Sequence, residues 1–170
     1  MSTSPLNLVS ENEYLHTPYR PDCDYVDGFV LERNLGQHDH ARLQGLILYW
    51  LMQHEMQWQI HALPECRLKI RSGKYRVPDV MVLPVAGSYP PVIEHPPLLC
   101  IEVVSPDDRL ADLVTRAGDY LALGVPLTWI FDPKTKQSFI YSDQGTVESF
   151  DPILRHGPIE LPSAELFTQL

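Results

Sequence analysis

The chain has 170 residues, of which 44% are hydrophobic and 21% charged, so it is long enough for one domain with a substantial core. No apolar run approaches the roughly 18 residues of a membrane helix, and residues 1–20 lack the basic start and apolar core of a signal peptide, so we expect a cytoplasmic protein with no membrane association. The net charge of −9 argues against a protein that coats nucleic acid non-specifically, although it leaves room for a local basic groove.

The first predicted elements are short. Residues 1–24 are polar and marked by proline, and we expect an N-terminal extension with one helical turn over Ser10–Leu15, capped by Ser10. Tyr25–Glu32 then predicts a small hairpin that turns at Asp27-Gly28. Residues 25–170 are predicted to form a single domain.

After this hairpin the hydrophobic period changes to that of a helix. Apolar residues recur at i, i+3, i+4, i+7 and i+8 from Leu43 to Leu51, which predicts an amphipathic helix over Asp39–His54 with Asp39 as its N-cap. His40 lies beside the predicted helix start. It is a candidate contact for a ligand or phosphate, and the alternative is a surface or cap-satisfied imidazole.

A second predicted hairpin is unusually basic. Cys66, Leu68 and Ile70 alternate with cations, Ser72-Gly73 supplies a turn, and no acid interrupts the run. One reading is a solvated edge strand made soluble by its charge. The other is a surface that contacts nucleic-acid phosphates. We call residues 66–76 the basic hairpin, and its five cations are Arg67, Lys69, Arg71, Lys74 and Arg76.

Two acids lie inside apolar segments that are predicted as buried strands. Asp79 opens the segment Pro78–Leu83, and Glu102 lies near the end of Leu98–Val104. An ionised carboxylate in such a place must be paired, protonated or bound to a cation. Each acid taken alone could cap a turn or meet a Lys or Arg. Two acids that converge on adjacent strands indicate a site for a divalent metal.

A helix is predicted from Asp107 to Leu123, between start signals at residues 105–108 and a stop at Gly124. One face of this helix carries a polar row that begins just beyond the Glu102 strand, so these side chains can contact whatever Glu102 binds. The alternative is a solvated row of ion pairs. Leu127–Phe131 is predicted as a core strand parallel to the Glu102 strand. Ser138–Tyr141 returns as an outer strand, and Leu166-Phe167 is expected to dock on the sheet. The polar row consists of Asp108, Asp112, Arg116 and Tyr120.

The predicted order is helix, strand, Asp79 strand, Glu102 strand, helix and strand. That order, with Pro78-Asp79 and Glu102-Val103-Val104 in these places, resembles the PD-(D/E)XK restriction-endonuclease-like superfamily. Within it, several motifs are similar to the bacterial Uma-two-type restriction endonucleases. They are Pro78-Asp79-Val80, Ile101-Glu102-Val103-Val104-Ser105-Pro106, Asp112, Tyr120, Gly124-Val125 and Trp129-Ile130-Phe131-Asp132-Pro133, and Tyr25–Glu32 and His40 fit the same pattern.

The resemblance implies a restriction-endonuclease-like fold of the α/β class (α+β mixed sheet), in which helices flank a central mixed β-sheet. It further implies hydrolysis of DNA phosphodiesters at a site where Asp79, Glu102 and the Val103 carbonyl hold Mg²⁺ or Mn²⁺. His40, Asp112 and Tyr120 are expected to support that site, and a homodimer is expected by analogy.

This chain departs from the resembled pattern at the catalytic lysine. Val104 stands at the motif position of that lysine, and Arg116 occupies its displaced position on the following helix. Arginine cannot act as a general base, although it can hold a phosphate or stabilise a developing charge. Two alternatives to an active nuclease therefore stay open. One is a catalytically impaired relative that binds nucleic acid or a protein partner, and the other is an unrelated α/β domain with structural acids.

Overall fold

A computed structural model describes residues 8–33, 37–86 and 89–170, and its centre is a six-stranded mixed sheet. The strands lie in the order β10-β9-β8-β7-β6-β3. All neighbours are antiparallel except β7 and β8, which are parallel and are joined by a helix. The strands are β3 (Ile60–Pro64), β6 (Val80–Pro84), β7 (Leu99–Val103), β8 (Thr128–Asp132), β9 (Gln137–Ser142) and β10 (Gly145–Ser149).

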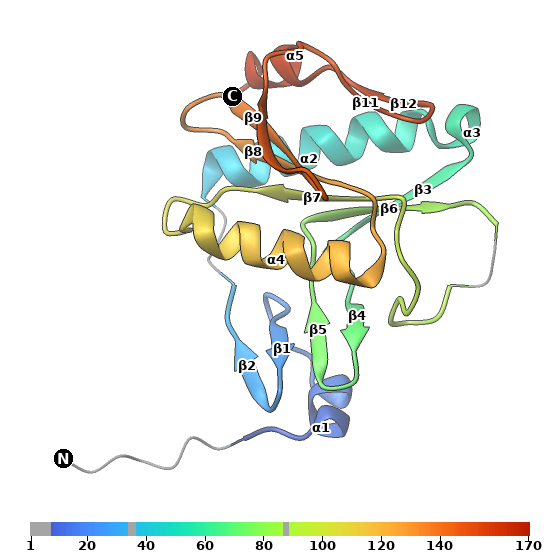
Figure 1. The fold of residues 1–170 in the computed structure, drawn as a ribbon, viewed down its shortest axis with the longest axis vertical. Coiled ribbons are helices and arrows are strands. Elements are labelled where there is room, and N and C mark those ends of the chain that lie inside the picture. The colour runs from blue at the N-terminus through green and yellow to red at the C-terminus, as the bar shows by residue number, and fades with distance from the viewer. Residues whose placement is uncertain (1–7, 34–36, 87–88) are drawn as a thin grey trace.

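Helices cover both faces of this sheet, so the predicted fold class is confirmed (Figure 1). Helix α2 packs on one face through the fully buried side chains of Leu43, Ile47 and Leu51, each worth about 1.5–3 kcal/mol of burial. Leu166 and Phe167 join the same core, as predicted. Helix α4 lies on the opposite face. The elements outside the sheet here are α2 (His38–Gln53), α3 (Glu55–Trp58), α4 (Leu110–Leu123), α5 (Ser163–Phe167) and the ribbon of β11 (Leu154–His156) and β12 (Ile159–Leu161).

A smaller sheet in the order β2-β1-β5-β4 forms a separate lobe below α4 in Figure 1. Helix α1 packs against it through the fully buried Tyr14, whose ring stacks on Tyr25 with 4.8 Å between centroids. The predicted cap of this helix is present, because the Glu13 amide donates to Ser10 Oγ at 3.1 Å. The elements of this lobe are α1 (Glu11–His16), β1 (Asp24–Val26), β2 (Phe29–Leu31), β4 (Leu68–Arg71) and β5 (Lys74–Arg76).

The neighbour of the Asp79 strand differs from the sequence expectation. The basic hairpin was expected just before that strand in the core, but it forms β4 and β5 of the smaller sheet, and β3 pairs with β6 instead. Only Ile60 and Ala62 of β3 are buried, and Pro64 ends it, so no long apolar run marks the strand in the sequence.

Helix boundaries also shift slightly from prediction. Helix α4 begins at Leu110 rather than Asp107, because the Asp108 carboxylate accepts from the Ser105 amide at 2.7 Å and holds a turn ahead of the helix. Gln37 takes the N-cap position of α2, and Asp39 lies in its first turn. Gly124 ends α4 at φ 112°, as predicted.

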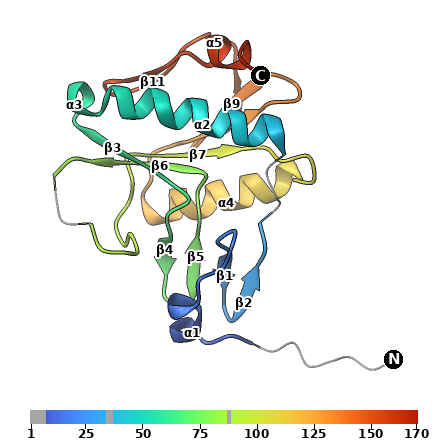
Figure 2. The ribbon, with the colours of Figure 1, turned by 180° about the vertical axis from the view of Figure 1, so that it is seen from behind.

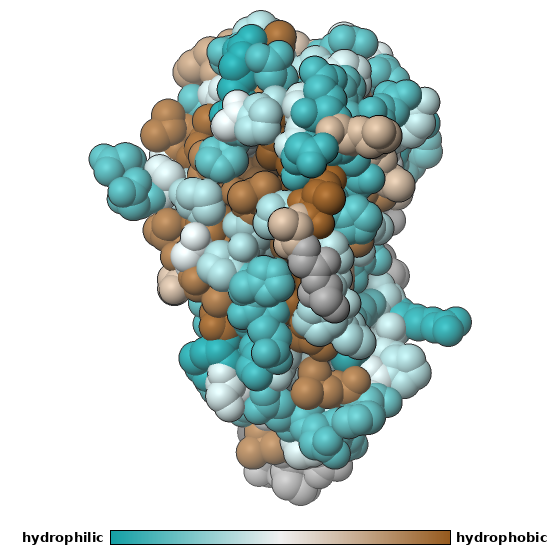
Figure 3. All heavy atoms as spheres, turned by 90° about the vertical axis from the view of Figure 1, so that its right-hand side faces the viewer, coloured by the Kyte–Doolittle hydropathy of each residue, from teal (hydrophilic) through white to brown (hydrophobic). Residues whose placement is uncertain are grey.

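Hydrophilic and hydrophobic side chains intermingle on the face shown in Figure 3, which is the right-hand side of Figure 1. Across the described ranges, none of the helices combines the length and the apolar character needed to cross a membrane.

Candidate active site

Asp79 and Glu102 share one face of the central sheet. The register pairs Val80 with Ile101, so the preceding Asp79 and the following Glu102 lie opposite each other on adjacent antiparallel strands. Strand alternation puts them on the side of Met81 and Cys100, which is the side that α4 covers. Both side chains are buried, with exposed fractions of 1% and 0%.

The Asp79 carboxylate is surrounded by donors. Its Oδ2 accepts from the Val103 amide at 2.7 Å and lies 3.4 Å from His40 Nε2, while its Oδ1 accepts from the guanidinium of Arg33. Burial raises the pKa of Asp79, but the His40 hydrogen bond and the charges of Arg33 and His40 outweigh that effect and lower it overall. Asp79 is therefore ionised at neutral pH.

Glu102 has fewer partners. Tyr120 donates its hydroxyl to Oε1 at 2.5 Å, and Arg116 Nη1 lies 3.3 Å from Oε2 without forming a hydrogen bond. Burial raises the pKa of Glu102 to about 7, with the neighbouring Asp79 adding to the rise and Arg116 opposing it. A cation placed beside this carboxylate would favour its ionised form.

Arg116 reaches the site from α4. Its Nη2 donates to the Val77 carbonyl at 3.1 Å, and its Nε lies 3.5 Å from Asp24 Oδ2. Burial lowers the pKa of Arg116, but the Glu102 carboxylate raises it well above the usual value. Arg116 thus stays charged and cannot accept a proton. Asp112, expected to orient it from one turn earlier, is exposed, and Asp24 lies against the guanidinium instead.

Unsatisfied polar atoms concentrate at this site. Among the described residues, five buried side-chain nitrogen or oxygen atoms lack a hydrogen-bond partner, and four of them belong to Arg33, His40, Glu102 and Arg116. The fifth is Trp129 Nε1. Buried polar groups are nearly always satisfied in folded proteins, so such a cluster marks a place that a ligand completes.

A small cavity of about 10 Å³ lies between Arg33, Asp79 and Arg116. Its wall includes His40, Ser105 and Asp108, which also line a groove of about 700 Å³. The groove lies at the edge where α2 and α4 begin and where β8 turns into β9; Figures 1 and 2 place these three segments together from both sides. The acids are thus buried beneath the floor of an open groove.

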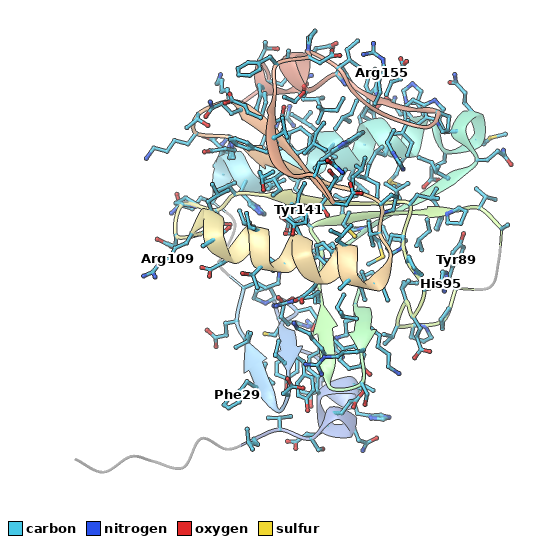
Figure 4. The ribbon with its side chains drawn as sticks, in the orientation of Figure 1. Phe29, Tyr89, His95, Arg109, Tyr141 and Arg155 are labelled. Carbon is cyan, nitrogen blue, oxygen red and sulfur yellow. The ribbon has the colours of Figure 1, made fainter. Side chains whose placement is uncertain are left out.

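Two lysines border the groove on the β8–β9 turn. Lys134 and Lys136 are exposed, and neither side chain has an ion-pair partner in the part of the chain that the structure describes. Arg109, at the start of α4, projects away from the molecule at the same edge (Figure 4). This edge offers cations to an anionic ligand, although Asp39, Asp108 and Asp132 also line the groove.

The basic hairpin does not present the free cationic face that its sequence predicts. Arg67 pairs with Asp22 and is 12% exposed, and Arg76 pairs with Asp24 and Asp119 and is 8% exposed. The predicted exposure of Arg67 is therefore wrong, because acids distant in sequence fold against it. Lys69, Arg71 and Lys74 also have acidic partners, respectively Glu94, Asp27 and Asp119. The proposed nucleic-acid contact of all five stays a prediction.

The donor set fits a hard divalent cation. Among the residues that the structure describes, no three His, Cys, Asp or Glu side chains cluster as ligands of one metal ion. Mg²⁺ commonly binds one or two carboxylates and keeps waters and substrate phosphates as its other ligands. Asp79, Glu102 and the Val103 carbonyl match that pattern, and the unpartnered Glu102 Oε2 is available as an oxygen ligand.

Comparison with known proteins identifies the family. The model of the family Uma2, described as "Putative restriction endonuclease", matches residues 11–166. The chain belongs to the Uma2 family. The resemblance drawn from the sequence motifs is therefore confirmed. No functionally curated protein matches the chain.

One solved structure shares the fold of this chain over nearly its whole length. A nuclease of DUF820 from Anabaena variabilis, described as putative, superposes with a TM-score of 0.82 at 21% identity, covering 94% of this chain and 98% of its own. A DrdV–DNA complex gives a TM-score of 0.44 at 14% identity and covers 75% of this chain and 11% of its own. The first match shows that the whole fold is shared.

Sequence reasoning missed two charged residues of the site. Asp24 is the first residue of β1, and Asp79 directly precedes β6. An acid at the start of a strand was therefore a signal that could have identified Asp24. Arg33 lies in the connection between β2 and α2, and nothing in its neighbourhood marks it as a partner of Asp79.

Proposed function

We propose that this Uma2 chain is a cytoplasmic, metal-dependent endonuclease that hydrolyses phosphodiester bonds in DNA. The observation that carries the proposal is that the buried Glu102 Oε2, which accepts no hydrogen bond, lies beside the ionised Asp79 on one face of adjacent strands, and that Asp79 lines a small cavity next to an open groove. Family membership supports the nuclease class. A homodimer that presents two such sites to the two strands is part of the proposal.

Asp79, Glu102 and the Val103 carbonyl would hold Mg²⁺ or Mn²⁺. The bound ion would lower the pKa of a water and polarise a phosphoryl oxygen. Tyr120 fixes the Glu102 carboxylate by donating to Oε1, and the Val103 amide fixes Asp79. Burial beneath α4 keeps other waters from the two acids.

Arg116 has an electrostatic role in this proposal. It is held from three sides, by Glu102, Asp24 and the Val77 carbonyl, and it remains protonated. A fixed guanidinium stabilises negative charge that develops on a phosphate, and it costs little reorganisation at the moment of reaction. It does not replace a lysine as a proton acceptor.

The groove gives the DNA strand a path to the buried acids. Lys134 and Lys136 are free to neutralise phosphates, while the cations of the basic hairpin already have carboxylate partners. We therefore infer that the groove edge contributes more to DNA affinity than the hairpin does.

The second candidate function is a catalytically impaired domain that binds nucleic acid or a protein partner. Two observations favour it. Arg116 stands where the resembled family carries lysine, and the Arg33 guanidinium already occupies Asp79 Oδ1. In that case the two arginines replace the metal as permanent counter-charges for the acids.

Cleavage assays distinguish the two functions. Supercoiled, linear and single-stranded DNA are incubated with Mg²⁺ or Mn²⁺, using the wild type, Glu102→Gln and the control Asp143→Asn. Asp143 is an exposed acid in the β9–β10 turn, at the far end of the sheet. We expect the wild type and Asp143→Asn to cleave DNA at the same rate. The cleavage rate of Glu102→Gln should fall by more than the roughly 10- to 100-fold loss seen when a residue that only supports a metal ligand is changed. Wild-type DNA binding without cleavage supports the impaired domain.

A further inference from the structure

One arginine of the site occupies a position from which it can move. Arg33 follows β2 in an irregular connection, and its side chain is 10% exposed. Its Nη2 donates to Asp79 Oδ1, its Nη1 lies 3.8 Å from the half-exposed Glu65, and its buried Nε has no partner. Arg116, by contrast, projects from regular helix and is held from three sides.

The Arg33 guanidinium takes the oxygen that a metal would need. Asp79 Oδ2 faces both the Val103 amide and His40, whereas Oδ1 accepts from the Arg33 guanidinium, so a movement of Arg33 would free Oδ1 for another ligand. The adjoining cavity measures about 10 Å³, near the lower limit for a single water. Mg²⁺ keeps several waters when it binds protein. A hydrated ion therefore competes with Arg33 for the space beside Asp79.

A substrate phosphate offers Arg33 a second partner. Arg33 lines the small cavity together with His40, Ser105 and Asp108, and those three residues also line the groove. A phosphodiester in the groove thus comes within the neighbourhood of the guanidinium. Arg33 donates one hydrogen bond to Asp79, and arginine can bind a phosphate through two, so the exchange loses no hydrogen bond.

We propose that Arg33 is a positioning residue that moves from Asp79 to a substrate phosphate, and that this exchange admits the metal only when DNA is bound. The inference rests on the proposed nuclease function. It makes metal binding and DNA binding mutually reinforcing, with each ligand tightening the other. It also gives the protein a reason to keep two arginines beside two acids.

Metal affinity tests the exchange without relying on cleavage. Mn²⁺ binding is measured by calorimetry and electron paramagnetic resonance for wild type, Arg33→Gln and Arg42→Gln, the last being an exposed arginine on α2. Each is measured alone and with a short phosphorothioate DNA duplex, and with a methylphosphonate duplex that lacks backbone charge. Circular dichroism establishes that each variant is folded.

Without DNA, we expect Arg33→Gln to bind Mn²⁺ about five- to a hundredfold more tightly than wild type, which is the usual range of coupling between two sites. The charged duplex should tighten Mn²⁺ binding by wild type and Arg42→Gln by a larger factor than it does for Arg33→Gln, where the phosphate acts only as a metal ligand. The uncharged duplex should have no effect. Equal or weaker Mn²⁺ binding by Arg33→Gln overturns the proposal.

A second variant keeps the test valid if Arg33→Gln does not fold. Glu65→Gln removes a half-exposed charge that lies 3.8 Å from Arg33 Nη1, and so weakens the hold on Arg33 beside Asp79. It should therefore tighten Mn²⁺ binding, as Arg33→Gln does, but by a smaller factor. If the wild type cleaves DNA but neither variant changes the Mn²⁺ affinity, the Arg33 exchange is refuted and the proposed nuclease function is not. Failure of wild type to bind Mn²⁺ even with DNA refutes both this inference and the proposed nuclease.

Discussion

The basic hairpin and the acidic site are both rich in charge, but they satisfy it differently. In the hairpin, all five cations have carboxylate partners, including the bidentate contact of Arg67 with Asp22 and the shared contacts of Arg76 with Asp24 and Asp119. At the site, four buried polar atoms remain without hydrogen bonds. A run of like charge in the sequence is therefore paired within the fold here, while two isolated acids in apolar strands mark the place where buried polar atoms lack hydrogen bonds.

The difference follows from what each region has to accommodate. The cations of the basic hairpin are paired by acids of the small sheet, of α4 and of the connections, such as Asp24, Asp119 and Asp22, and the buried pairs among them are fixed parts of the fold. At the site, by contrast, the pKa of Glu102 is raised and its Oε2 accepts no hydrogen bond. Four experiments test this contrast between the two regions.

Removing one partner of the hairpin network should have the largest effect on folding. Asp24→Ala leaves the buried Arg76 with Asp119 as its remaining acidic partner and removes a neighbour of Arg116, and breaking a buried pair costs about 3–5 kcal/mol. Urea unfolding measures the loss. Asp27→Asn is the control, because the Asp27–Arg71 pair lies exposed beside the same sheet and asparagine tolerates the φ of 47° at this position, so stability should be nearly unchanged. Equal effects of the two substitutions would contradict a structural role for the buried network.

Glu102 should make the metal-free protein less stable as the pH rises. Its folded-state pKa of about 7 lies above the unfolded value of 4.5, so the native state binds its proton more tightly. Stability from this group is present near pH 5 and falls by about 3 kcal/mol as the pH rises to 8, at about 1.36 kcal/mol per pKa unit.

Unfolding in EDTA at pH 5 and pH 8 measures this difference. The raised pKa of His40 acts in the same direction, so the comparison of wild type with Glu102→Gln isolates Glu102. The variant should show the smaller pH dependence. A variant with the wild-type slope would mean that Glu102 is not the buried titrating acid.

Arg116 should affect turnover more than DNA affinity. Arg116→Ala removes a fixed charge from the site, and we expect a loss of about a hundredfold in the single-turnover rate, as for other preorganised donors. Arg116→Lys should keep or raise divalent-dependent cleavage, since it restores the resembled family residue. An inactive wild type whose lysine variant cuts DNA would show that the arginine marks a lost activity. Unchanged cleavage by Arg116→Ala would return Arg116 to a structural ion pair.

The groove lysines should produce the smallest change. Lys134→Gln with Lys136→Gln should weaken DNA binding several-fold and flatten the plot of log affinity against log salt by about one to two units, or roughly 0.9 for each phosphate that the variant no longer neutralises. The control is the double variant Lys69→Gln with Arg71→Gln, which removes the same charge from the hairpin, where both cations already have partners. A larger change in the hairpin variant would restore the hairpin as the DNA surface.

Local spacing in the sequence was enough to predict the individual elements. The apolar stripe from Leu43 to Leu51 predicted α2, Asp27-Gly28 predicted the first turn, and Gly124 marked the end of α4. The two acids stood out because their neighbours are aliphatic. These features depend on interactions a few residues apart, where spacing and backbone preference decide the outcome.

Which charges meet depends instead on the tertiary fold. Arg33 is 46 residues from Asp79, and Arg67 is 45 residues from Asp22, so no spacing rule connects either pair. The placement of β3 beside β6, and of the basic hairpin in a separate sheet, depends in the same way on long-range strand pairing. Ion pairing and register are set by burial against the rest of the fold, and that is why the sequence identified the acids but not Arg33, which pairs with Asp79.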